Sequence, residues 1–270
     1  MAIDIIIDYQ CVPKETLGTE GILERLKGQE RAEEVIRLFR RNDDDRPPSK
    51  MGFEFTRSTP DGQEETRLIV VQGLLDEAEE LKPLESYCEG CPANVGERPF
   101  GCMSFIQYPV SSQAEAWLLD RLPVPDEPLV WLLLKQGVQE FQYDGKSVTP
   151  MRAVRQDDGS GVYFEAEQGA LRRLGEIEVT ADQVFEMIFG VGHINPNHAG
   201  ILLLFFLAID RDLDAKQIMR VSSLPANAKT DFPLTIKDER DDDRNIREFK
   251  TFLRALYRAW ALGMRLMVDA

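Results

Sequence analysis

Residues 88–102 read Cys88-Glu-Gly-Cys91-Pro-Ala-Asn-Val-Gly-Glu-Arg-Pro-Phe-Gly-Cys102 and hold three of the four cysteines in a chain of 270 residues. Glycine and proline recur through this stretch, which predicts turns in place of a regular helix or strand. Thiolates carried on a short loop are suited to binding a metal ion. We therefore expect a cysteine-rich loop at 83–103 that stabilises the fold around a metal.

The spacing of the three cysteines supports a shared ligand. The two-residue spacer lets the sulfurs of Cys88 and Cys91 point to one side of a tight turn, and Gly90 permits the backbone angles of such a turn. Cys102 returns after ten further residues, directly after Gly101, which allows the backbone to approach closely. This pattern predicts that several sulfurs converge on one ion.

A closed zinc site requires a fourth ligand. Cys11 is the remaining thiol, and it completes a predicted four-thiolate set of Cys88, Cys91, Cys102 and Cys11. The two imidazoles of the chain, His193 and His198, are the alternatives for the fourth position. Zinc is the expected cofactor. An iron–sulfur cluster is the alternative, because cysteine followed by proline recurs in cluster-binding sequences, although the spacing here differs from theirs.

Two other interpretations of the cysteines compete with metal binding. Cysteine is often a small buried hydrophobic residue without chemistry of its own. Cys88 and Cys91 also have the spacing of a redox dithiol, but such a pair normally begins a helix that follows a strand, and this segment does not. The alternative function is an iron–sulfur or dithiol redox protein that uses Cys88, Cys91 and Cys102.

The composition excludes some partners. The formal net charge is -15, the wrong sign for general binding to nucleic acids or anionic membranes. The longest apolar run, Ile201 to Ile209, is far shorter than the roughly 20 residues of a membrane-spanning helix. No targeting segment is evident, so we expect a soluble cytoplasmic protein whose thiols are kept reduced.

The hydrophobic pattern predicts an α+β fold in which helix dominates, with short strands and hairpins, as one large domain or two closely packed subdomains. In the first half we expect a strand at 2–11, a helix to Arg41 that Thr19 caps and Gly28 interrupts, a hairpin at 53–68, a helix at 71–81 and a strand at 103–110. Pro83 is expected to end the helix before the cysteine-rich loop.

In the second half, two sequences match the helix capping box, Ser112-Gln-Ala-Glu115 and Thr180-Ala-Asp-Gln183. Helices are expected at 112–122, 129–141, 180–189, 196–209 and 243–262, with a hairpin at 152–166 and a closing strand at 265–268. The expected domains are an N-terminal α+β region, 1–125, carrying the cysteine-rich loop, and a mainly helical C-terminal region, 126–270.

The final helix carries basic residues at intervals of three and four, namely Arg247, Lys250, Arg254 and Arg258. Such a row either docks an anionic partner or phosphate, or is simply solvated or paired with carboxylates of the protein itself. No known catalytic motif is present, and the sequence leaves open whether the protein is an enzyme. We predict an accessory or regulatory protein with a structural zinc ion, for which another protein is the candidate partner.

Overall fold

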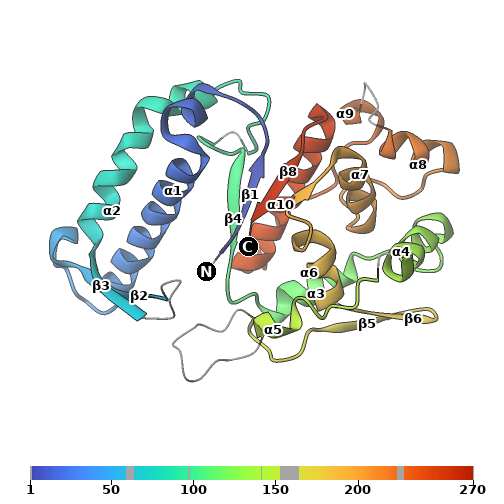
Figure 1. Ribbon diagram of the computed structural model, residues 1–270, viewed down its shortest axis with the longest axis horizontal. Coiled ribbons are helices and arrows are strands. Elements are labelled where there is room, and N and C mark those ends of the chain that lie inside the picture. The colour runs from blue at the N-terminus through green and yellow to red at the C-terminus, as the bar shows by residue number, and fades with distance from the viewer. Residues whose placement is uncertain are drawn as a thin grey trace. The chain divides into compact units, whose positions relative to one another are not determined.

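The computed structural model describes residues 2–58, 64–96, 98–140, 142–152, 164–223 and 228–269 (Figure 1). About 52% of the chain is helical and about 16% is strand, and the sheets are small and antiparallel. This confirms the predicted α+β class with helix dominant. The turn expected at 59–62 and most of the hairpin expected at 152–166 lie outside the described residues.

Contacts divide the chain into two compact units. The large unit comprises Met1–Tyr9, Pro92–Glu97 and Gly101–Ala270, and the small unit comprises Gln10–Cys91 and Arg98–Phe100. The cysteine-rich segment therefore contributes residues to both. The expected division into 1–125 and 126–270 stays a prediction, because a grouping by contacts does not test which regions fold independently.

A four-stranded antiparallel sheet forms the centre of the large unit. Its order is β4 (Met103–Gln107), β1 (Ala2–Ile7), β8 (Leu266–Asp269) and β7 (His193–Ile194). In β1 every second side chain is buried, with Ile5 facing Ser104 of β4 and Val268 of β8 in the register. The predicted first and last strands are thus confirmed, although β1 ends at Ile7.

Helix α10 (Arg244–Leu262) lies against this sheet and packs on α7 (Pro196–Phe205) (Figure 1). Asp243 caps α10 by accepting a hydrogen bond from the amide of Ile246 at 2.7 Å, and Gly263 ends it with φ 67°. The side chains predicted to face inward are buried: Ile246, Phe249, Leu253, Leu256 and Trp260. Helix α7 is buried on all sides over residues 202–205, as its uniformly apolar sequence predicts.

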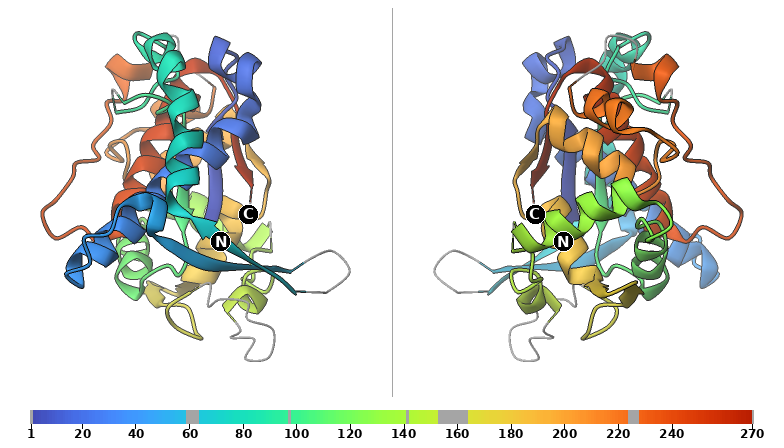
Figure 2. Two further views of the ribbon diagram at one scale, coloured as in Figure 1. Left: turned by 90° about the vertical axis from the view of Figure 1, so that its left-hand side faces the viewer. Right: turned by 90° about the vertical axis from the view of Figure 1, so that its right-hand side faces the viewer.

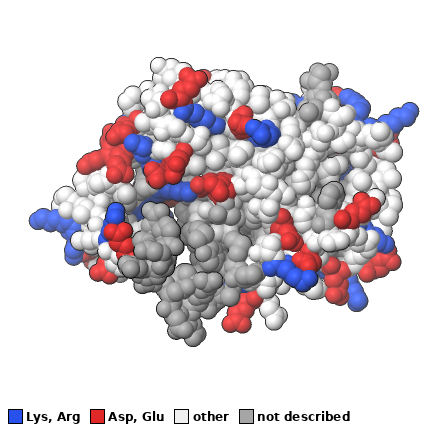
Figure 3. All heavy atoms as spheres, viewed as in Figure 1, with Lys and Arg blue, Asp and Glu red and all other residues white. Residues whose placement is uncertain are grey.

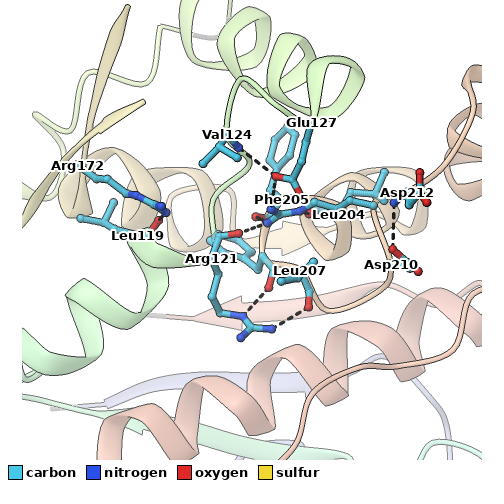
Figure 4. A network of polar contacts seen from close by, with 12 residues as sticks. Leu119, Arg121, Val124, Glu127, Arg172, Leu204, Phe205, Leu207, Asp210 and Asp212 are labelled. Carbon is cyan, nitrogen blue, oxygen red and sulfur yellow. Dashed lines mark hydrogen bonds and ion pairs between the residues drawn. The ribbon is translucent and has the colours of Figure 1, made fainter. Parts of the chain in front are cut away.

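Two arginines donate to carbonyls at and just beyond the C-terminal end of α7 (Figure 4). Arg211 donates to two of these carbonyls and, at 2.8 Å, to the carboxylate of Glu127, while Arg121 donates to two more. The four acceptors, each 2.6–2.7 Å from its donor, belong to Leu204, Phe205, Phe206 and Leu207. Burial lowers the pKa of Arg211, and Glu127 opposes that shift.

The rest of the large unit is a series of short elements, several of which appear in the side views of Figure 2. They are α3 (Ser112–Asp120), α4 (Pro128–Glu140), α5 (Thr149–Arg152), β5 (Leu171–Leu174), β6 (Ile177–Thr180), α6 (Ala181–Phe189), α8 (Ala215–Ser222) and α9 (Ala228–Asp231). The predicted capping box before α6 is confirmed, because Thr180 and Gln183 exchange both hydrogen bonds. The β5–β6 hairpin and α8 were not predicted.

The capping box expected at Ser112 is wrong by one residue. Ser111 is the N-cap of α3, and its hydroxyl accepts from the amide of Ala114 at 3.1 Å and donates to Asp243. Glu115 does not reach back to the cap. It is buried and forms an ion pair with Arg152 at 2.7 Å, an interaction that a local motif cannot predict.

This difference predicts opposite sensitivities for two adjacent serines. Ser111→Ala should reduce the free energy of unfolding by about 1 kcal/mol, because the helix start loses its acceptor. Ser112→Ala should change it by less than about 0.5 kcal/mol, as expected for a surface substitution that removes no cap. Urea unfolding of the two variants beside the parent chain measures both values, and a larger loss in Ser112→Ala would contradict the assigned cap.

In the small unit, α1 (Val12–Arg41) packs along α2 (Val71–Ala78), and the ribbon of β2 (Gly52–Ser58) and β3 (Glu64–Val70) lies at one end of this pair (Figures 1 and 2). The short helix η1 (Pro48–Lys50) precedes β2. Their core contains buried Ala32, Met51 and Val71, with partly buried Val35, Ile36, Phe39, Phe53, Leu74 and Leu75 around it.

Two predictions for the small unit are wrong. The interruption of α1 is at Gly18, where φ is 71° and ψ is 162°, and the helix continues through Gly28. The chain also stays helical beyond Pro83, as the 3₁₀ helix η2 (Glu79–Cys88). This 3₁₀ helix is ten residues long, which is uncommon for its type, and Pro83 lies inside it. The irregular part of the cysteine-rich segment therefore begins only after Cys88.

Candidate functional site

Cys88 and Cys91 lie on the turn that ends η2. The amide of Cys91 donates to the carbonyl of Cys88 at 3.3 Å, and Gly90 has φ 67°. Only glycine adopts that backbone conformation without steric cost. The tight turn predicted from the two-residue spacer is therefore present, and it holds both cysteine side chains on one short stretch of backbone.

Phe100 provides a hydrogen bond to the sulfur of Cys88. Its backbone amide lies 3.2 Å from Cys88 Sγ, and the phenylalanine side chain is only 3% exposed. The backbone of Phe100 has φ 54°, which is uncommon for a residue with a side chain. Hydrogen bonds to the ligand atoms orient and tune metal sites in proteins. The amide of Phe100 therefore orients the sulfur of Cys88.

Cys11 and Cys91 both act electrostatically on Cys88. Burial raises the pKa of the Cys88 thiol, the Phe100 amide lowers it, and the thiolates of Cys91 and Cys11 and the carboxylate of Glu85 raise it further. Cys11 directly precedes α1 and belongs to the same unit as Cys88 and Cys91.

The three thiols of the small unit are not all within coordination distance of one another. Sulfur ligands of one zinc ion lie about 3.8 Å apart, since each is about 2.3 Å from the metal. Among the described residues, the one group of three metal-ligating side chains whose ligand atoms lie within 4.8 Å of one another is Glu239, Asp241 and Asp242. Binding of an ion by Cys11, Cys88 and Cys91 therefore requires their side chains to move closer together.

Cys102 belongs to the large unit, where its carbonyl accepts from the amide of Ile7 at 2.9 Å and its side chain is buried. Gly101 before it meets the backbone of residues 94–95: a Cβ atom there would lie 2.2 Å from the carbonyl oxygen of Val95 and 2.3 Å from Asn94 Oδ1. The close backbone approach predicted at Gly101 is therefore present. It anchors the chain immediately before the fourth predicted ligand.

The two imidazoles proposed as alternative ligands both lie in the large unit. His193 is exposed in β7. His198 is half-buried in α7, and burial lowers its pKa.

The carboxylate group at 239–242 is already engaged within the protein. Lys250 Nζ donates to both oxygens of Asp242, at 2.6 and 2.7 Å, and both side chains are buried. Arg254 pairs with Asp238 at 2.9 Å, and Arg247 donates to the carbonyl of Asp242. These contacts support the interpretation that the basic row of α10 pairs with the protein's own carboxylates.

On the face seen in Figure 3, acidic and basic side chains are interspersed, without a broad surface of one sign among the residues drawn in colour. Within the part of the chain that the structure describes, no helix has both the length and the apolar character needed to cross a membrane.

No protein-family model, curated protein or solved structure matches this chain. The residues of the candidate site must therefore carry the functional argument. Sequence reasoning did not find Phe100, because its contribution is a backbone amide that any residue supplies. An indirect structural signal marks the position. Residues 98–100 belong to the small unit, whereas residues 92–97 and the chain from Gly101 onward belong to the large unit.

Proposed function

We propose that this chain is a metal-binding protein of accessory or regulatory type, in which thiolates hold a structural zinc ion in the cytoplasm. Two observations support the proposal: Cys88 and Cys91 share one tight turn, and the amide of Phe100 is directed at Cys88 Sγ. Cys11 belongs to the same unit and acts electrostatically on Cys88.

Cys102 is the proposed fourth ligand. It follows Phe100 by two residues, so the covalent chain limits the distance between their Cα atoms to about 7 Å. Phe100 itself contacts Cys88. Structural zinc prefers four thiolates or three thiolates with one imidazole, and the set Cys11, Cys88, Cys91 and Cys102 satisfies that preference.

A bound zinc ion would supply cross-linking and no reaction. It would join Cys11, which precedes α1, to the turn after η2. In the sequence, 76 residues lie between Cys11 and Cys88. Because an unfolded chain does not hold a preformed site, the free energy of metal binding adds to the free energy of folding. The acidic composition favours a protein partner over a nucleic acid or a membrane.

Elemental analysis of protein purified without a metal-affinity tag tests the proposal. We expect about one zinc ion per chain, and loss of that zinc in Cys88→Ser and Cys91→Ser, since serine does not replace a thiolate ligand. Cys11→Ser and Cys102→Ser test the other two ligands, while His193→Ala and His198→Ala are matched controls that should retain the metal. Absence of stoichiometric zinc and iron from the parent protein would refute the proposal.

An absorption spectrum of the same anaerobic preparation separates zinc from the alternative cofactor. A zinc–thiolate site is colourless because zinc is d¹⁰, whereas an iron–sulfur cluster absorbs visible light. Brown protein with stoichiometric iron would establish the redox alternative in place of the structural one.

A further inference from the structure

We propose that Cys91 is a site of reversible oxidation by hydroperoxides, with Cys88 as the thiol that converts the oxidised Cys91 into a disulfide. If the site holds a metal, this oxidation releases it. The release rests on the proposed function, but the thiol chemistry rests only on the turn at residues 88–91.

The turn places the two cysteines at a separation that a disulfide can bridge. The hydrogen bond from the Cys91 amide to the Cys88 carbonyl, 3.3 Å long, closes a four-residue turn. Residues at the two ends of such a turn have Cα atoms less than about 7 Å apart. A disulfide needs a Cα separation of about 4.4–6.8 Å. The bond therefore requires side-chain rotation and little movement of the backbone.

Accessibility assigns different roles to the two thiols. Cys91 is half-buried, whereas Cys88 is 8% exposed and accepts the Phe100 amide. A small oxidant therefore meets Cys91 first.

The chemistry balances with hydrogen peroxide as the oxidant. The Cys91 thiolate attacks one peroxide oxygen, the O–O bond breaks, and hydroxide leaves and takes a proton to become water, so that Cys91 becomes a sulfenic acid. The Cys88 thiolate then attacks the Cys91 sulfur, the S–O bond breaks, and a second water forms. Two thiols are oxidised by two electrons in total, and one peroxide is reduced to two waters.

Loss of metal follows from the same reaction. A disulfide sulfur carries no negative charge to donate to zinc, so the reaction removes two of the four proposed ligands at once. Because two remaining thiolates do not form a closed zinc site, the ion is expected to leave. Reduction of the disulfide by a dithiol restores both ligands.

Peptide mapping after limited oxidation tests this inference. The full 270-residue chain, both as purified and after treatment with EDTA, is exposed to less than one equivalent of hydrogen peroxide and then quenched with an alkylating reagent. We expect the Cys88–Cys91 disulfide to be the first product in both samples. A chromophoric chelator should detect zinc release in step with disulfide formation, and dithiothreitol should reverse the oxidation.

Variants assign the order of the two steps. In Cys88→Ser, Cys91 should accumulate as a sulfenic acid that a dimedone reagent traps, while Cys102→Ser should still form the Cys88–Cys91 disulfide. A first disulfide that contains Cys11 or Cys102, or a Cys91 that stays reduced while other thiols are oxidised, would overturn the inference. Protein that lacks metal but forms the expected disulfide would refute the proposed function and leave the oxidation site intact.

Discussion

Replacing Lys250 with methionine should reduce the free energy of unfolding by about 3–5 kcal/mol, the range for removing one partner of a buried ion pair. Lys250 and Asp242 have side chains only 2% and 3% exposed, and the ammonium contacts both carboxylate oxygens. Methionine keeps the aliphatic stem but leaves the Asp242 carboxylate buried without its cation. Urea or thermal unfolding of the variant measures the loss.

A matched control lies one turn further along the same helix. Arg254 pairs with Asp238, but that carboxylate is 65% exposed. Arg254→Met should therefore cost less than about 1 kcal/mol, because water already solvates the partner. Equal losses in the two variants would show that burial does not distinguish these ion pairs and would contradict the prediction.

The same pair should affect the pH dependence of stability. Burial raises the pKa of Asp242, but hydrogen bonds from the Glu239 amide and the Lys250 ammonium outweigh it, so the pKa in the folded protein is below its ordinary value near 3.8. A lowered pKa stabilises the folded state at pH values above the ordinary pKa. This stabilisation is lost as the pH falls through the lowered pKa. The difference between the parent and Lys250→Met should accordingly be larger at pH 7 than at pH 3.

Gly101→Ala is the second substitution with a large expected effect. The added Cβ would lie 2.2 Å from the carbonyl oxygen of Val95, and a backbone atom cannot rotate away as a side chain can. Overpacking in a well-packed region costs about 1–3 kcal/mol, and we expect a loss near the upper end of this range. Chemical denaturation measures that loss.

Metal content provides a second measurement for the same variant. Gly101 joins Phe100, the donor to Cys88, to Cys102, the proposed fourth ligand. A backbone shift at this residue should therefore lower zinc occupancy together with stability. Gly137→Ala is the control, since an added Cβ in α4 has no neighbour within 4 Å and alanine favours a helix. Unchanged stability and zinc in Gly101→Ala would show that the loop tolerates the methyl group.

Local patterns were sufficient for the elements whose stabilising interactions are local. Strand β1 follows from alternating isoleucines, α10 from its apolar spacing with Asp243 and Gly263 at its ends, and the start of α6 from the Thr180–Gln183 capping box. Each signal involves side chains a few residues apart that meet because of the geometry of the helix or strand itself.

Two differences from the predictions arose where residues distant in sequence compete for the same group. Glu115 has the spacing of a capping residue, but Arg152 and the amide of Ala170 bind it in the interior. Lys250 pairs with one of the protein's own carboxylates, as one interpretation of the basic row predicts, but its complete burial against Asp242 was not predicted. Burial decides both cases, because a charged group that loses water must find a partner wherever the fold supplies one.

The amino-acid sequence by itself determined the α+β class, the cysteine turn with its glycine at residue 90, and the close backbone approach at Gly101, because each depends on covalent geometry and short-range sterics. Only the tertiary structure decided that Cys11 acts electrostatically on Cys88, and that the amide of Phe100 points at a sulfur. Such contacts join residues through the packing of α1, α2 and η2, and no local periodicity encodes the distance between helix ends.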